Sequence, residues 1–153
     1  MALRIGDPAP EFSGVTAEGT PVSLGDYRGR KLVLYFYPMD DTPGCTAQAC
    51  SLRDHEREIA ARGAAILGVS AQSRSSHRRF AEKHGLRFPL LIDTDQKVAK
   101  AYGAAGAGLF GIARGMLGMN RRITFIIDEG GRIARIIADP DTAHHGEQVL
   151  EGL

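Results

Sequence analysis

Both cysteines of this chain lie in one short segment whose residue types could carry redox chemistry. Residues 38–50 follow the apolar stretch 32–37, so a buried strand leads into a sharp turn and the turn opens a helix. Thr42 is a good N-cap residue, and Pro43 suits the first helical position. Cys45 then lies in the first helical turn, where unpaired N–H groups and the positive end of the helix dipole favour a thiolate. The sequence therefore predicts that Cys45 is reactive.

The spacing of Cys45 and Cys50 argues against some of the sites that two cysteines could form. A metal site needs about four ligands at spacings such as C-x2-C, whereas this pair is C-x4-C and the histidines are scattered, so we predict no metal. A structural disulfide is disfavoured, because residues five apart in an intact helix are separated by ~7.5 Å of rise and ~140° of rotation. Two inert buried cysteines remain an alternative. A bond between the two sulfurs would require the helix to unwind. This suggests that the segment has two states, an intact helix with both thiols reduced and an opened first part of the helix with the sulfurs joined.

Polar and rigid residues near the predicted turn could assist such a thiolate. The hydroxyl of Thr42 can face the sulfur of Cys45 across the first turn, and Pro38 can shield the site from water. An arginine could pair with a thiolate and a substrate oxygen together, because its guanidinium is a fixed fork of donors. Arg122, directly before a predicted strand, is the best placed candidate, and Arg121 is its rival.

Two other groups of polar residues are interpreted as surface features. Asp40 and Asp41 precede the helix, and we predict that both are solvated turn residues. His144 and His145 form a pair before the last predicted helix, and a surface position is expected for them rather than a ligand role.

The rest of the chain alternates predicted strands and helices in the order of an α/β protein. A small N-terminal hairpin is expected from residues 12–15 and 21–24. The further elements are strand 32–37, helix 43–62 ended by Gly63, strand 64–70, helix 74–84 between Ser73 and Gly85, strand 88–91, a helical turn at 95–102, strands 124–128 and 132–138, and helix 144–153. This order predicts a mixed central sheet flanked by helices.

Length and charge limit the classes of function. The 153 residues, 43% hydrophobic, are enough for one substantial core, so we expect a single domain over residues 1–153. The net charge of +1 gives no reason to expect nucleic acid as a partner. No apolar segment reaches signal-peptide or membrane-span length, so we expect no membrane association and a cytoplasmic location. In a reducing cytosol, a lone cysteine pair is more often transient and catalytic than structural.

Residues 104–119 do not fit the regular pattern. They are rich in Gly and Ala yet contain large apolar side chains that an ordinary solvated loop would not expose. Two interpretations stay open. The apolar side chains could fold back on the core, or they could form a surface for self-association or a partner.

The motif P-x-x-x-T-x-x-C at residues 38–45, with Cys50 five residues later, resembles that of a peroxiredoxin of the bacterioferritin comigratory protein group, also called the Q type. The resemblance covers nearly the whole chain. Further matching segments, in order, are Arg53-Asp54, Gly68-Val69-Ser70, Phe88-Pro89-Leu90-Leu91, Ala101-Tyr102-Gly103 and Arg122-Ile123-Thr124-Phe125-Ile126-Ile127-Asp128.

The resemblance implies a thioredoxin fold and a thiol-dependent peroxidase. Cys45 would attack hydrogen peroxide or an alkyl hydroperoxide and become a sulfenic acid. Thr42 and Arg122 would position the peroxide and stabilise charge on the departing oxygen. Cys50 would be the resolving residue, closing an intramolecular disulfide that thioredoxin or a similar dithiol reduces. No metal or organic cofactor is implied, and we expect a monomer or weak homodimer.

Two alternatives of other kinds remain open. A thiol–disulfide oxidoreductase would share the fold, although its usual C-x-x-C pair at the helix start is absent here. A holdase or binding module could instead use the apolar surface of residues 104–119, with unwinding of the cysteine helix as its redox switch.

Overall fold

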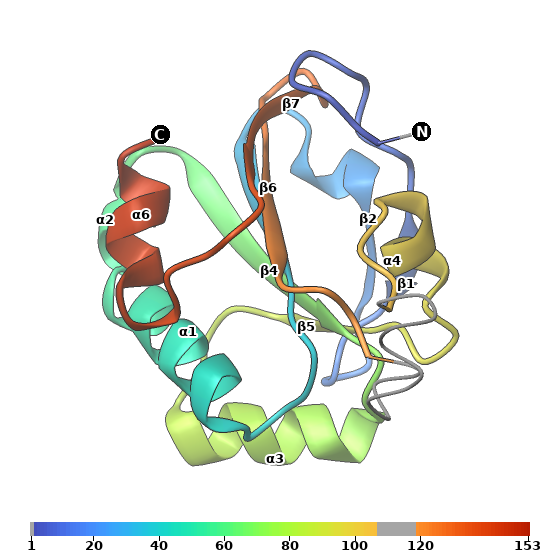
Figure 1. Ribbon diagram of the computed structural model, residues 1–153, viewed down its shortest axis with the longest axis vertical. Coiled ribbons are helices and arrows are strands. Elements are labelled where there is room, and N and C mark those ends of the chain that lie inside the picture. The colour runs from blue at the N-terminus through green and yellow to red at the C-terminus, as the bar shows by residue number, and fades with distance from the viewer. Residues whose placement is uncertain (1, 107–118) are drawn as a thin grey trace.

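The computed structural model describes residues 2–106 and 119–153 and has a five-stranded mixed sheet at its centre (Figure 1). The strand order is β5-β4-β3-β6-β7, and β1 and β2 form a separate hairpin. The elements are β1 (Ser13–Val15), β2 (Pro21–Ser23), η1 (Leu24–Tyr27), β3 (Lys31–Phe36), α1 (Pro43–Asp54), α2 (Glu56–Ala61), β4 (Ala64–Ser70), α3 (Arg74–His84), β5 (Leu90–Ile92), α4 (Lys97–Ala101), β6 (Ile123–Ile127), β7 (Ile133–Ile137), η2 (Thr142–His144) and α6 (His145–Leu150). The predicted mixed α/β sheet and the N-terminal hairpin are confirmed.

Strand β3 is the centre of the sheet. It pairs in parallel with β4 and antiparallel with β6, so it has a neighbour on each side. Its residues from Leu32 to Phe36 are all almost completely buried, because helices or the hairpin cover both faces. β3 therefore leads from the buried centre of the sheet into the loop that precedes α1.

The side chains of β3 alternate between two apolar layers. Leu32, Leu34 and Phe36 pack against the hairpin, η1 and α4. Val33 and Tyr35 pack against α1, α2, α3 and α6 on the other face. Figure 1 shows α1, α2 and α6 gathered on one side of the sheet, with α4 and the hairpin on the other. The cysteine helix α1 thus belongs to the second layer.

The expectation of one continuous helix over residues 43–62 is wrong. Helix α1 ends at Asp54 and α2 begins at Glu56, with His55 between them at φ −107° and ψ 7°. The ring Nδ1 of His55 lies 2.8 Å from the Ser51 carbonyl oxygen, the acceptor that the His55 backbone N–H would use in a continuous helix. That N–H donates instead to the Leu52 carbonyl at 3.2 Å. Competition between side chain and backbone thus breaks the helix.

The Gly/Ala-rich segment singled out from the sequence lies mostly outside the described residues. Residues 107–118 are in that part of the chain, so neither interpretation of them is tested. Ala104, at its start, is fully buried, and Ala105 packs against the first apolar layer. Within residues 2–106 and 119–153, no helix is long and apolar enough to span a membrane.

Helix α6 holds the second half of α1 in place. The backbone N–H of Gly146 donates to the Ser51 hydroxyl at 2.9 Å. A Cβ added at Gly146 would meet the His55 ring and would come within 2.5 Å of the Ser51 carbonyl oxygen. The two helices can approach this closely only because residue 146 has no side chain.

Gly146→Ala should therefore destabilise the protein by roughly 1–3 kcal/mol, since the added methyl group has no space and one of its neighbours is backbone. Urea unfolding measures the loss. Gly25→Ala is the matched control, because a Cβ there comes no closer than 3.8 Å to the Ser23 hydroxyl. Equal free energies of unfolding for the two variants would contradict the close packing of α6 on α1.

Candidate active site

Cys45 lies in the first turn of α1, as the turn pattern predicts. Thr42 is the N-cap with an extended backbone, and Pro43 is the first helical residue. The Thr42 hydroxyl does not cap the helix; it donates to the Met39 carbonyl at 3.0 Å and closes the loop instead. Cys45 is 1% exposed, and its thiol and that of Cys50 are both free. Its buried position near the helix start combines the local dipole with exclusion of water.

Arg122 contacts the sulfur of Cys45. Its Nη2 donates to Cys45 Sγ at 3.4 Å, and its Nη1 donates to Gln48 Oε1 at 2.7 Å. Gly44 permits this approach, because a Cβ there would lie only 3.1 Å from Nη2. The rival Arg121 is exposed and donates instead to the Gly103 carbonyl at 3.0 Å. The structure therefore brings Arg122, and not Arg121, to the thiol.

Strand pairing explains how Arg122 reaches Cys45. Ile123, the first residue of β6, pairs with Phe36, the last residue of β3. Arg122 therefore lies beside the end of β3, where the chain turns into the loop that leads to α1. Pro38 lies in that same loop, half-buried, and its carbonyl accepts a long 3.4 Å hydrogen bond from Ser70 at the end of β4. The candidate residues thus lie together at the end of the central strand β3.

Cys50 follows Cys45 on the same intact helix, five residues further on. It is half-buried, and the helix that separates the two sulfurs is unbroken between them. The separation expected for residues five apart in a helix therefore applies, and a bond between these sulfurs requires a change in α1.

The expectation that Asp40 is a solvated turn residue is wrong. Asp40 is 8% exposed, and its carboxylate accepts three hydrogen bonds from residues around it. Tyr37 donates at 2.6 Å and Ser76 at 2.7 Å, while the His77 ring Nδ1 lies 2.7 Å away. Burial raises the pKa of Asp40, but the hydrogen bonds and charge of His77, with the hydroxyls of Tyr37 and Ser76, more than offset this and lower it.

Asp41 remains on the surface, as predicted. It has a left-handed backbone, with φ 61°, which costs a non-glycine residue about 1 kcal/mol or more. Its carboxylate accepts from Lys83 at 2.9 Å and lies 3.2 Å from the His84 ring nitrogen, so it also tethers the loop to α3.

The two histidines at the start of α6 differ in their exposure to solvent. His144 is exposed as expected, but His145 is fully buried, which the sequence interpretation missed. Its Nε2 lies 2.9 Å from the Thr124 hydroxyl, and its Nδ1 lies 2.8 Å from Oε1 of Gln148 on α6. Burial lowers the pKa of His145, and the nearby guanidinium groups of Arg135 and Arg122 act in the same direction.

Two buried polar atoms near Cys45 are left without a hydrogen-bond partner within the described residues. They are the Tyr35 hydroxyl and the Gln48 amide nitrogen. Burial raises the pKa of Tyr35 well above its usual range, and negative charge on Cys45 and Asp40 raises it further, so the phenol keeps its proton. Gln48 was not predicted from the sequence, although its position three residues after Cys45 puts both side chains on one helix face.

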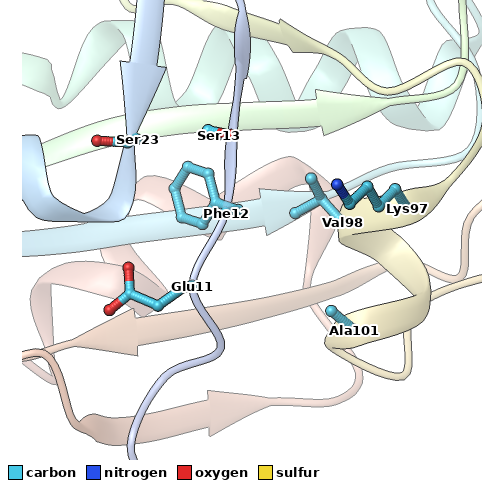
Figure 2. A pocket seen from close by; sticks show the side chains of 7 residues that line it. All are labelled: Glu11, Phe12, Ser13, Ser23, Lys97, Val98 and Ala101. Atoms are coloured by element: carbon cyan, nitrogen blue, oxygen red, sulfur yellow. The ribbon is translucent and has the colours of Figure 1, made fainter.

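The hollow drawn in Figure 2 is separate from this thiol site. It holds about 380 Å³ and lies between the N-terminal segment and α4. Its lining residues are Glu11, Phe12, Ser13, Ser23, Lys97, Val98 and Ala101. The described ranges contain no group of three or more His, Cys, Asp or Glu side chains placed to hold a metal ion.

A cysteine in the first turn of a helix, with an arginine on its sulfur, is in the environment of a reactive thiol. Residues 5–136 match the family model described as the AhpC/TSA family. The chain belongs to this family, and it is a thiol peroxidase.

Named relatives agree with this membership. Peroxiredoxin Bcp of Escherichia coli (strain K12) is 40% identical over 151 residues, covering 99% of this chain and 96% of that protein. Peroxiredoxin Bcp of Bacillus subtilis (strain 168) is 38% identical over 159 residues, covering 100% and 96%. The crystal structure of peroxidoxin BcpB from Mycobacterium tuberculosis matches with a TM-score of 0.87 at 31% identity, covering 98% of this chain and 96% of that one. The predicted thioredoxin-type peroxiredoxin fold is thereby confirmed.

Arg122→Ala should slow the reaction of Cys45 with hydrogen peroxide by roughly 10- to 100-fold, the effect of losing one hydrogen bond to a charged group. Arg121→Ala should change the rate less than about twofold, because within the described residues that side chain donates to the exposed Gly103 carbonyl and not to the thiol. Single-turnover kinetics on both variants measures this. Equal rates, or a larger loss in Arg121→Ala, would refute the assignment.

Proposed function

We propose that this protein reduces hydrogen peroxide and alkyl hydroperoxides through a sulfenic acid at Cys45. The observation that carries the proposal is the 3.4 Å contact between Arg122 Nη2 and the sulfur of Cys45, a buried residue in the first helical turn. A cationic donor on a buried sulfur favours the thiolate, the form that attacks peroxide. A structure from Xanthomonas campestris, 30% identical with a TM-score of 0.81 over 92% of this chain, concerns the alkyl peroxide reduction activity of its bacterioferritin comigratory protein.

In the first step, the thiolate of Cys45 attacks the distal oxygen of the hydroperoxide. The S–O bond forms while the O–O bond breaks, so the sulfur is oxidised to sulfenic acid and the peroxide is reduced to an alcohol or water. The departing oxygen takes up a proton. Further N–H groups of Arg122, besides those that donate to Cys45 and Gln48, and the hydroxyl of Thr42 are the proposed partners of the peroxide oxygens, with Pro38 limiting access of water.

In the second step, the thiol of Cys50 attacks the sulfur of the Cys45 sulfenic acid. An S–S bond forms, the S–O bond breaks, and the hydroxyl leaves as water. The intact α1 separates the two sulfurs, so its first turns must open for this step. Thioredoxin or a similar dithiol then reduces the disulfide by exchange and is itself oxidised. No cofactor takes part in this cycle.

Cys45→Ser should abolish peroxide consumption, because a serine hydroxyl is not appreciably ionised at neutral pH and forms no sulfenic acid. Cys50→Ser is the matched variant on the same helix. It should consume one equivalent of peroxide and then stop with one added oxygen on Cys45, detectable by mass spectrometry. Continued turnover of Cys50→Ser with a thioredoxin system would show that Cys50 is not the resolving residue, and turnover of Cys45→Ser would overturn the whole assignment.

Oxidation should loosen α1 while the sheet stays folded, since the Cys45–Cys50 disulfide cannot form on an intact helix. Hydrogen exchange on the reduced and oxidised protein measures this. Amide protection in residues 43–54 should fall on oxidation, whereas β4 and β6 should keep theirs. Treatment with a dithiol should restore the original profile. An unchanged profile in a sample fully oxidised at both cysteines would mean that the sulfurs do not pair within one chain.

A further inference from the structure

A buried carboxyl–imidazole pair holds the loop between β3 and α1, and the proposed cycle does not use it. The pair is Asp40 in the loop and His77 on α3, whose side chains are 2% and 0% exposed. The Asp40 Oδ2 atom is shared between the His77 ring and the Ser76 hydroxyl, while Oδ1 accepts from Tyr37 at the end of β3. The Asp40 carboxylate thus connects the loop to Tyr37, directly after β3, and to Ser76 and His77 on α3.

The ring of His77 is bonded through both of its nitrogens. Nε2 lies 3.1 Å from the Leu91 carbonyl oxygen, and a carbonyl can only accept, so Nε2 carries a hydrogen. Nδ1 lies 2.7 Å from Oδ2 of Asp40. This short, buried contact joins the loop to α3.

From this arrangement we infer that Asp40 is a positioning residue for peroxide, acting with His77 to fix the loop that carries Pro38 and Thr42. This inference rests on the proposed function, in which Thr42 contacts the peroxide and Pro38 limits access of water. The loop contains a left-handed residue, Asp41, and a turn closed by the Thr42 hydroxyl on the Met39 carbonyl. Such a conformation persists only where surrounding contacts impose it.

The anchor is on α3 and not on α1. Asp40 receives its hydrogen bonds from Tyr37, Ser76 and His77, all outside the cysteine helix. The loop can therefore keep its place when the first turns of α1 open. Loss of the anchor should disturb the peroxide-contacting groups more than the thiol itself, because Arg122 reaches Cys45 from β6 by a separate route.

The experiment compares two reactions of Cys45 in the same variants. The rate with hydrogen peroxide depends on the positioned loop, whereas the rate with iodoacetamide reports only the accessible thiolate. Asp40→Asn should lower the ratio of the two rates roughly 10- to 100-fold, since the substrate contacts are displaced. Glu82→Gln, an exposed carboxylate on α3 that faces Arg78 at 3.9 Å and lies outside the loop, is the matched control and should leave the ratio unchanged.

Milder variants keep the test decisive if Asp40→Asn does not fold. Tyr37→Phe and Ser76→Ala each remove one hydroxyl from Asp40 and should each lower the ratio by about threefold. The double variant Asp40→Asn/His77→Gln should have a ratio no lower than Asp40→Asn alone, because the two side chains act as one pair.

The outcomes separate this inference from the function on which it rests. Wild-type protein that consumes no peroxide overturns both. Wild-type protein that does consume it, with the same ratio in Asp40→Asn, Tyr37→Phe, Ser76→Ala and Glu82→Gln, overturns the positioning role alone. A parallel fall in both rates would show that Asp40 stabilises the whole site without positioning peroxide, and would also overturn it.

Discussion

The hydrogen bond from Arg122 to the Cys45 sulfur depends on the antiparallel pairing of β3 with β6. The register that sets Phe36 opposite Ile123 places the guanidinium at the point where β3 enters the loop. A shift of one residue would turn Arg122 to the other face of the sheet. The other polar atoms of the site are arranged around this contact: Gln48 holds the second arm of the guanidinium, and Gly44 leaves the space that it occupies.

The loop and the helix on either side of Thr42 are attached to different parts of the protein. The loop is tied to α3 through Asp40 and Asp41, whereas the far end of α1 is tied to α6 through Ser51 and Gly146. The cysteines lie between these two attachments. A segment fixed at both ends can open in its middle without losing its place, which is the mechanical requirement of the cycle proposed for Cys45 and Cys50.

The sequence predicted the parts of the site that depend on local pattern. Thr42 and Pro43 mark the helix start that places Cys45, and the apolar run 125–127 marks the strand that delivers Arg122. The burial of Asp40 and of His145 could not be predicted in this way, because their partners lie on elements distant in sequence. The break at His55 has the same origin: a side chain takes a backbone acceptor where α6 packs against the helix.

The 77 residues that separate Cys45 from Arg122 also matter while the protein is being made. At a synthesis rate of about 5–20 residues per second, roughly 4–15 seconds pass between the addition of the cysteine and that of the arginine. A growing chain therefore carries its thiol before the guanidinium that lies on it, and β3 has no antiparallel neighbour until β6 emerges. The electrostatic environment of Cys45 is completed only late in translation. The thiol is therefore synthesised well before it reaches its full reactivity.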